Sequence, residues 1–359
     1  MNIINKTSFP TETIPNKGPD GKHFVTIIVK GTFATKHGQV AARADDQMPI
    51  AYSDEPFDPK KGGSIKFEAD LAPFKPRADI VLVGHAYALP GALVNSLDAA
   101  IKVGVHGKTL RIYGNRFWRC PALSAPRPSE PEAFTKMPMV YEKAFGGMDK
   151  LNGGYCPENM VGIGYWSKVD RKIIQEKPLP NIEDPKALIQ SPEDKPKPVG
   201  FGYYGRAWAP RAGYLGTYDE NWRKQRAPEP PLDFKYDYHN AAHPDLQIKG
   251  YLRGDEPVSL HNLTPDGTLQ FRLPGVSISC MAEKSYDLLV DHLEKTAPGH
   301  PSLESLWRMP PEKTAVTMHL DTLCLMPDEK RCYLIWRGRV PVFDTTALEV
   351  KEILIEARG

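Results

Sequence analysis

Residues 199–222 read VGFGYYGRAWAPRAGYLGTYDENW, and the chain is organised around this run and its continuation to Pro274. Glycine, proline, aromatic residues, arginine and aspartate alternate here without helical period or strand alternation, which indicates tightly built loops. The wider window 141–251 holds 10 of the 15 tyrosines and 3 of the 6 tryptophans. Because disordered segments are poor in aromatic residues, we expect these loops to be ordered and to bind a partner.

On the N-terminal side of this stretch, several segments have the composition of β-strands. Residues 24–33 and 79–88 are apolar and rich in β-branched side chains, which predicts buried strands. Residues 99–106 and 108–113 flank Gly107, which predicts a hairpin whose glycine takes the positive φ of a tight turn. The polar, proline-containing residues between these strands, 41–78, predict a connecting loop.

Strands return on the C-terminal side. Residues 314–325 and 332–342 predict a second hairpin around the turn 327–330, which reads PDEK. Two other segments remain open between helix and strand. They are 281–295, whose leucines suit one helical turn although its flanks suit strands, and 347–357.

This arrangement predicts a mainly-β fold: a single β-sandwich or barrel-like body with a large loop-rich, aromatic central insertion. The 29 glycines and 35 prolines agree with many turns, since together they exceed the roughly 12% of residues that is usual. We expect one domain over 1–359, with a body of terminal strands at about 24–120 and 314–357 and a loop-rich central section at 138–275. A division into two domains near residue 130 is the alternative.

The overall charge excludes some classes of partner. The chain has 46 basic and 44 acidic residues, so its net charge of +2 predicts no nucleic-acid or membrane partner. The N-terminal run MNIINKTSFPTETIP has no apolar core, so we expect no secretory signal. The five cysteines are an odd number without a CxxC pair, which favours reduced thiols. We therefore expect a cytoplasmic protein.

Two short motifs suggest cofactors but lack the necessary context. Residues 200–205 spell GxGxxG, yet no strand precedes them and Pro210 interrupts any helix that follows, so a dinucleotide site is not expected. His239 and His243 have the spacing of a zinc helix, but Asn240 stands where the general-base glutamate would be. We expect no cofactor and no metal.

Carboxylates in the central loops leave one enzymatic alternative open. Two of them facing each other across a sugar, with aromatic rings as a platform, would make a carbohydrate-active β-protein. Arginines at 206, 211, 223 and 226 are interleaved with these acids, however, which favours paired structural clamps. The carboxylates in question are Glu142, Glu183, Asp184, Asp219, Asp233 and Asp237.

Several blocks follow one another along the central section, namely PMVYEKAFGG (138–147), NMVGIG (159–164), LPNIE (179–183), WAPR (208–211), GTYD (216–219) with Trp222, PLDF (231–234) and Asn240. In content and order they resemble a family of bacterial proteins, long known as a domain of unknown function, that serve as adaptors or chaperones of type VI secretion effectors. The resemblance spans roughly residues 24–342. It is densest from 138 to 274.

The resemblance implies a non-catalytic protein. Such adaptors bind a secreted effector, or its PAAR-like spike-tip region, and help to load it on the trimeric spike protein. The expected partners are therefore the effector, a PAAR-like spike-tip protein, or both, and also the spike protein. No residue of the blocks is implied to be catalytic.

Elementary chemistry also gives the block residues a structural role. Gly216 can turn the chain where a Cβ would clash, Asp219 can cap neighbouring amides, and Trp208 is large enough to anchor a loop core. Each block residue therefore either binds the partner or anchors a loop, and these two roles are not separable in the sequence. The candidate residues are Tyr141, Glu142, Phe145, Gly146, Gly147, Tyr203, Tyr204, Trp208, Arg211, Gly216, Tyr218, Asp219, Trp222, Asp233 and Asn240.

Overall fold

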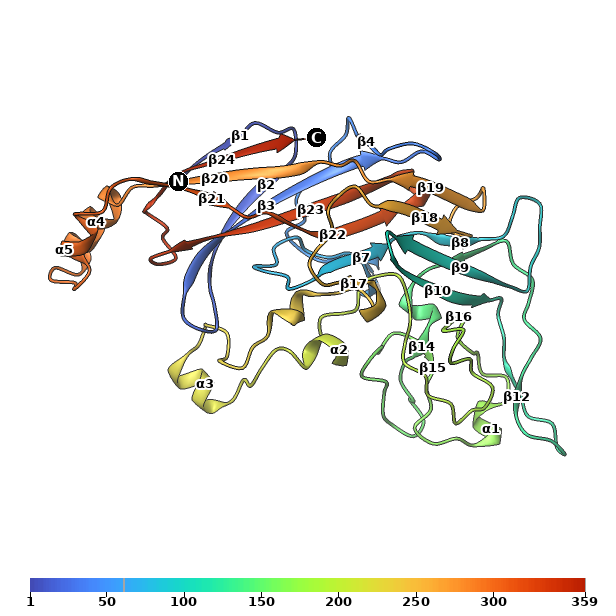
Figure 1. Cartoon of the computed structure of the whole chain (residues 1–359). Coiled ribbons are helices and arrows are strands. Elements are labelled where there is room, and N and C mark those ends of the chain that lie inside the picture. The colour runs from blue at the N-terminus through green and yellow to red at the C-terminus, as the bar shows by residue number, and fades with distance from the viewer. Residues whose placement is uncertain (61, 359) are drawn as a thin grey trace.

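The computed structural model describes residues 1–60 and 62–358 (Figure 1). Its largest sheet has seven strands in the order β17–β7–β22–β23–β3–β2, with β4 also beside β3. This sheet is open, because β17 and β2 end the order without pairing with each other. Its strands are β2 (Thr11–Lys17), β3 (His23–Ala34), β4 (Ala42–Arg43), β7 (Ala78–Leu82), β17 (Gln247–Ile248), β22 (His319–Met326) and β23 (Arg331–Val342).

Two long strands from opposite ends of the chain form the centre of this sheet. β3 and β23 pair antiparallel from Ala34 opposite Arg331 to His23 opposite Val342. Both are buried over most of their length, because both faces of the sheet are covered, and this explains their nearly continuous apolar sequence. The predicted strands at 24–33 and 332–342 are confirmed.

Two segments predicted as single strands are each divided between sheets. The segment 79–88 forms β7, which runs parallel to β22, and then β8 (His85–Tyr87), which pairs with β13 (Lys136–Pro138). The segment 314–325 contributes to β21 (Glu312–Val316) and β22, which belong to different sheets. Apolar composition marked most of the strand residues correctly, but it did not show where the chain leaves one sheet for another. The turn at 327–330 is confirmed, with Lys330 at φ 53°.

A five-stranded sheet contains the predicted N-terminal hairpin, but its turn was placed wrongly. The turn lies at Gly104, with φ 58°, and Gly107 lies inside β10 opposite Lys102. Gly107 is needed for close approach instead, because a Cβ there would lie 2.6 Å from the main-chain oxygen of Ile101. The strands of this sheet, in order, are β16 (Ile182–Glu183), β10 (His106–Tyr113), β9 (Ser96–Val103), β18 (Pro257–His261) and β19 (Thr268–Arg272).

A four-stranded sheet joins the two ends of the chain, in the order β1 (Asn2–Asn5), β24 (Val350–Arg358), β20 (Ser277–Lys284) and β21. Both segments left open between helix and strand are settled here. The segment 347–357 is mostly strand β24, whereas 281–295 ends β20 and then forms α4 (Asp287–Thr296). α4 and α5 (Leu303–Leu306) project beyond the sheets at one end of the molecule (Figure 1).

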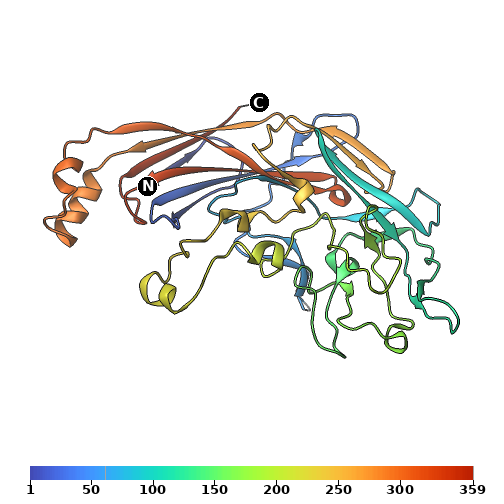
Figure 2. The same ribbon diagram turned by 60° about the horizontal axis from the view of Figure 1, so that its bottom comes forward.

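The central section consists mainly of loops, and it lies on one side of the largest sheet (Figures 1 and 2). The segment 41–78, predicted as loop, contains β4 and the hairpin β5–β6, and its Lys61 is outside the described residues. The remaining short elements are β5 (Glu55–Asp58), β6 (Gly62–Phe67), β11 (Trp118–Arg119), β12 (Arg127–Pro128), η1 (Tyr141–Lys143), β14 (Phe145–Gly146), β15 (Ile163–Gly164), α1 (Arg171–Ile174), α2 (Ala209–Ala212), α3 (Glu220–Gln225), η2 (Tyr236–His239), η3 (Pro244–Leu246) and η4 (Pro327–Glu329).

The fold is mainly β, with several sheets in a sandwich-like arrangement, as the sequence predicted. One large hydrophobic cluster includes residues from all three main sheets and from the central section. A smaller cluster around Phe145, Ile174 and Leu179 lies within the loops themselves. Among the described residues, the helices are all too short or too polar to cross a membrane.

Candidate functional site

The loop 68–75 connects the largest sheet with the central section through buried charges. Lys30 of β3 donates to the Asp70 carboxylate at 2.8 Å, and Arg337 of β23 donates to the main-chain oxygen of Asp70 at 2.6 Å. Arg337 is also paired with Asp321 of β22. All of these side chains are buried, so removing one partner would leave an uncompensated charge at a cost of about 3–5 kcal/mol.

Arg211 joins this loop to the central section. Its guanidinium forms an ion pair with Glu68 at 2.6 Å and donates to the main-chain oxygens of Tyr238 and Tyr204 at 2.8 and 2.9 Å. The Arg211 side chain is almost completely buried. It therefore holds three segments together and presents no surface to a partner.

A cluster of aromatic rings lies beside Arg211. Tyr141 and Trp208 pack edge to face with ring centroids 5.1 Å apart, and Tyr204 lies 5.1 Å from Tyr141. A Cβ on Gly200 would lie 2.8 Å from the ring of Tyr141, and one on Gly205 would lie 2.6 Å from the Trp208 indole nitrogen. The glycines of the GxGxxG run thus leave room for aromatic rings.

Two further candidate residues fix the central section to the sheet. The hydroxyl of Tyr203 is hydrogen-bonded to that of Tyr333 of β23 at 2.6 Å. The Asn240 amide donates to the Asp79 carboxylate of β7 at 3.1 Å, and Lys75 forms an ion pair with the same carboxylate at 2.8 Å. Tyr203 and Asn240 therefore anchor the loops of the central section to the largest sheet.

The Asp149 loop, residues 147–156, begins at a constrained pair of glycines. Gly146 and Gly147 have φ values of 149° and 95°, which favour glycine. A Cβ would lie 2.2 Å from the main-chain oxygen of Asn159 at Gly146, and 2.3 Å from that of Gly162 at Gly147. Only glycine fits at these two positions, so the backbone conformation at the start of the Asp149 loop is fixed.

Asp149 organises this loop from inside. Its carboxylate accepts hydrogen bonds from the main-chain nitrogens of Leu151, Asn152 and Ser167 at 3.0–3.1 Å, and from the Ser167 hydroxyl at 2.8 Å. Burial raises the pKa of this carboxyl, but the hydrogen bonds outweigh burial and hold its pKa well below the usual value of 3.8. The loop is therefore ordered around a buried carboxylate ion.

The rigid Asp149 loop presents apolar side chains to solvent. Met148, Leu151 and Tyr155 are 60%, 67% and 50% exposed. Met148 and Tyr155 lie opposite each other in an isolated antiparallel bridge, so they are neighbours at the base of the loop. An ordered loop that exposes this much apolar surface is typical of a protein-binding site.

The α3 loop, residues 214–235, has a comparable construction. Gly216 turns with φ 79°, and the Asp233 carboxylate accepts from the nitrogen and hydroxyl of Thr217 at 3.0 and 2.8 Å. The Asp219 carboxylate caps α3 by accepting from the main-chain nitrogen of Trp222 at 2.8 Å. The loop is closed at its base and capped at its tip.

This loop also exposes apolar side chains. The rings of Tyr218 and Trp222 pack edge to face 4.5 Å apart, yet Tyr218 remains 52% exposed and Leu232 is 73% exposed. Both loops lie on the same side of the largest sheet (Figure 2). We name the exposed side chains of the two loops the loop face, which consists of Met148, Leu151, Tyr155, Tyr218 and Leu232.

The predicted residues thus divide by burial. Of the fifteen, Tyr218, Asp219 and Asp233 are exposed, while Glu142, Gly216 and Trp222 are partly buried. Glu142 accepts from the main-chain nitrogen of Ser64 at 2.7 Å. The buried residues are Tyr141, Phe145, Gly146, Gly147, Tyr203, Tyr204, Trp208, Arg211 and Asn240.

Sequence reasoning missed most of the loop face. Asp149 was detectable, because an aspartate followed by Asn152, Gly153 and Gly154 has the composition of a turn held by a carboxylate. The exposed Leu151 and Leu232 had no such signal, since a leucine in a loop is more often buried.

The six carboxylates of the carbohydrate alternative all have structural partners. Those of Glu142, Asp219 and Asp233 hold loop amides, as described above. Burial raises the pKa of Glu183, although a nearby guanidinium opposes this. The other three are paired as Glu183 with Arg116, Asp184 with Lys108, and Asp237 with Arg77.

The two histidines with zinc-like spacing are neutral at pH 7. Burial lowers the pKa of His239 to about 3 and that of His243 to about 4. His243 uses its ring nitrogen to cap η3, accepting from the main-chain nitrogen of Asp245 at 3.1 Å. Within residues 1–60 and 62–358, no group of three or more histidine, cysteine or acidic side chains is arranged to hold a metal ion.

Comparison with protein families gives one match. A family model described as "Uncharacterized protein conserved in bacteria (DUF2169)" matches residues 20–337. No curated protein and no solved structure matches the chain.

Proposed function

The chain belongs to the bacterial DUF2169 family, and we propose that it is a non-catalytic adaptor that binds a type VI secretion effector or its PAAR-like spike-tip region. In this role it stabilises the effector in the cytoplasm and helps to load it on the trimeric spike protein. The proposal starts from the resemblance of the sequence blocks described above.

The loop face is the structural observation that supports this proposal. Two loops that lie on the same side of the largest sheet (Figure 2) have separate internal hydrogen-bond networks, and together they expose five apolar side chains. Binding energy at protein interfaces is concentrated in a few residues, among which tyrosine is enriched, and the loop face contains Tyr155 and Tyr218. Because the loops are already ordered, binding costs little further conformational entropy.

The carbohydrate alternative receives no comparable support. General acid–base catalysis at a sugar needs two carboxylates that face the same bond. Here Asp219 caps a helix, Asp233 holds a turn and Glu183 is buried against an arginine. In these contacts the three carboxylates hold the loops in place.

A co-production experiment tests the adaptor proposal. The full chain is produced with a PAAR-like effector encoded beside it, and effector abundance and co-purification are measured. We expect the double variant Leu151→Asp/Tyr218→Asp to lose about tenfold or more of the binding, since hot-spot residues contribute about 2 kcal/mol or more. Leu93→Asp is the matched control, because Leu93 is as exposed as Leu151 but lies on the β8–β9 connection.

The expected gain in effector stability is also measurable. A partner that binds only the folded effector adds about 2.7 kcal/mol at a hundredfold excess over Kd. Deleting the adaptor should therefore lower effector level and export, while the spike still assembles. Unchanged levels of every effector encoded nearby would refute the adaptor proposal, whereas unchanged binding by the double variant alone would refute only the loop face.

A further inference from the structure

Arg339 of β23 is placed differently from its neighbour on the same strand. Its guanidinium lies 4.0 Å from the ring centroid of Phe74, 5.2 Å from that of Phe24 and 6.0 Å from that of Tyr236. The residue is exposed, and no acidic side chain of the described chain is within ion-pair distance of it. Arg337, two residues earlier, is buried and paired with Asp321.

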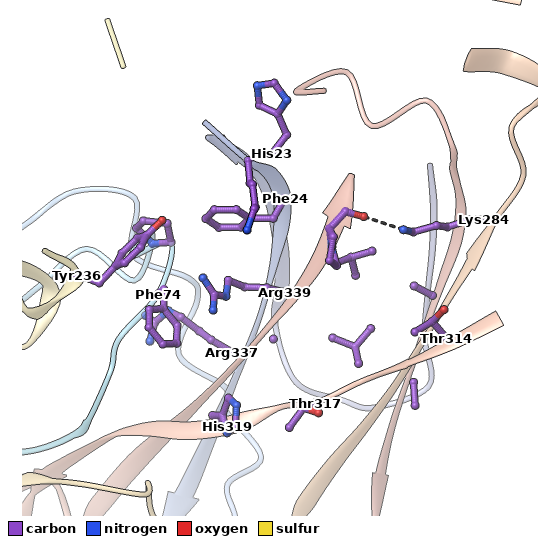
Figure 3. Close-up of a pocket in the computed structure, with 18 of the residues that line it drawn as sticks. His23, Phe24, Phe74, Tyr236, Lys284, Thr314, Thr317, His319, Arg337 and Arg339 are labelled. Carbon is purple, nitrogen blue, oxygen red and sulfur yellow. Dashed lines mark hydrogen bonds between the residues drawn. The ribbon is translucent and has the colours of Figure 1, made fainter. Parts of the chain in front are cut away.

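The contacts of the Arg339 guanidinium leave it able to bind an anion. Stacking on aromatic rings orients its plane, and the stacked faces leave the N–H groups at its edge free to donate. A carboxylate matches that edge with two parallel hydrogen bonds. Figure 3 shows Arg339 between the rings of Phe24 and Phe74, on the side of a pocket opposite Thr314 of β21.

The pocket itself lies between the largest sheet and the four-stranded sheet. It has a volume of about 850 Å³ and is lined from β3, β20, β21, β22 and β23. Much of its wall is apolar, including Ala315, Val316 and Val340. The Lys284 ammonium donates to the main-chain oxygen of Pro341 at 2.7 Å, so Arg339 is the better-placed cation.

One wall of the pocket is an unpaired strand edge. β21 pairs with β20 and with no other strand of the described chain, and residues 312 and 314–316 of β21 all line the pocket. Most of β21 is exposed. Such an edge carries unpaired N–H and C=O groups, which can pair with an extended segment of another protein.

From these two walls we infer that the pocket binds an extended peptide segment of a partner protein, which adds as a strand to β21 and places an acidic side chain on Arg339. Alternate side chains of an added strand point to opposite faces, so one of them can reach Arg339 while the backbone follows β21. The apolar wall suits aliphatic residues on either side of the acidic one.

A polyanion is a poorer occupant. The lining also holds Lys22, Lys284 and Arg337, but Lys22 is paired with Asp20 and Arg337 with Asp321, and Glu312 offsets Lys284. Among the lysine, arginine and acidic side chains this leaves one net positive charge, that of Arg339, which a single carboxylate neutralises and a doubly charged phosphate exceeds. A strand edge, moreover, gives no advantage to a nucleotide or to inorganic phosphate. A peptide with one acidic side chain fits both walls, because its backbone pairs with β21 while its carboxylate binds Arg339.

Selection from a random octapeptide library tests this inference. The full chain is the target, and the library has two arms: peptides blocked at both ends and peptides with a free C-terminus. We expect blocked peptides with an internal aspartate or glutamate among aliphatic and β-branched residues. The best peptide should bind about tenfold or more weakly when its acid is replaced by the amide, since a hydrogen bond to a charged group is lost.

Variants of the chain then locate the site. Arg339→Gln should give the same loss, and Arg339→Lys a large part of it, because lysine keeps the charge but loses the fork and the stacking. Arg253→Gln is the matched control, since Arg253 is exposed and lies outside the pocket lining, and it should bind like the parent. The urea midpoint of each variant checks that it is folded.

Several results would overturn the inference. These are selected peptides without an acid, selection of free C-termini only, or binding that Arg339→Gln leaves unchanged. The inference rests on the proposed function only in taking the segment from a partner of an adaptor. Because the library contains no effector, its failure leaves the co-production experiment to decide the adaptor proposal independently.

Discussion

Replacing Trp208 by alanine tests whether the block residues anchor the loops. Trp208 is only 5% exposed and packs edge to face on Tyr141. A buried tryptophan removes roughly 150–250 Å² from water, which corresponds to about 4–6 kcal/mol at about 25 cal/mol per Å². Alanine retains part of this burial, and measured losses for tryptophan to alanine are about 3–5 kcal/mol. We expect a loss of about 4 kcal/mol.

Such a loss is large beside the roughly 5–15 kcal/mol that stabilises a typical domain. Urea unfolding, followed by circular dichroism, measures it. With an m-value of about 3 kcal/mol per M or more, the midpoint should fall by about 1 M. A Trp208→Phe variant should recover part of the loss, because phenylalanine restores most of the buried area but leaves a small cavity.

Two other tryptophans provide a matched series. Trp222 is partly buried and donates its indole N–H to the main-chain oxygen of Glu229 at 2.8 Å, so Trp222→Ala should cost about 1–3 kcal/mol. Trp307, which directly follows α5, is 69% exposed, and Trp307→Ala should change stability by less than about 0.5 kcal/mol. The assignment of Trp208 as an anchor is wrong if the free energy of unfolding of Trp208→Ala lies within about 1 kcal/mol of the parent's. It is also wrong if Trp307→Ala lowers that free energy more than either of the other two variants.

Three further variants test other contacts. Gly216→Ala should destabilise by about 1–3 kcal/mol in urea unfolding, because alanine is strained at φ 79° and its Cβ would lie 2.6 Å from the Asp233 carboxylate. Arg337→Met should cost about 3–5 kcal/mol, since it leaves the Asp321 charge buried alone, and adding Asp321→Leu should recover much of that loss. For Asp149 the folded pKa is lowered, so its contribution is complete above the ordinary pKa of 3.8 and is lost as pH falls through the lowered value. The parent should therefore lose more stability than Asp149→Asn between about pH 6 and about pH 3, and equal losses would show that the carboxylate ion does not hold the loop.

The parts of the fold that could be predicted are those set by local composition. β3 and β23 are apolar over nearly their whole length, because both faces of their sheet are covered, and such runs are visible without knowledge of their partners. The hairpin turn at Gly107 was misplaced because a glycine can serve either a turn or a close approach. At Gly107 the reason is the main-chain oxygen of Ile101 across the hairpin. A composition pattern does not contain that contact.

The candidate site was predictable to a similar degree. Block residues such as Trp208 and Arg211 attract attention in the sequence because they are large or charged, and the structure places both of them in buried contacts. Residues that anchor a loop and residues that bind a partner can have the same composition. Leu151 differs from a core leucine only in its position at the tip of a loop held by Asp149.

Arg337 and Arg339 show most directly why local pattern does not decide function. They are two residues apart on β23, so their side chains project from the same face of the sheet. Arg337 forms an ion pair with Asp321 of the neighbouring strand. It also donates to the main-chain oxygen of Asp70, so it holds the sheet to the loop 68–75. Arg339 lies where Phe74 and Tyr236 cover the strand instead, so its guanidinium contacts aromatic rings and has no acidic partner among residues 1–60 and 62–358. The difference arises from segments that are distant in the sequence, and it is this difference that makes one arginine structural and the other a binding residue.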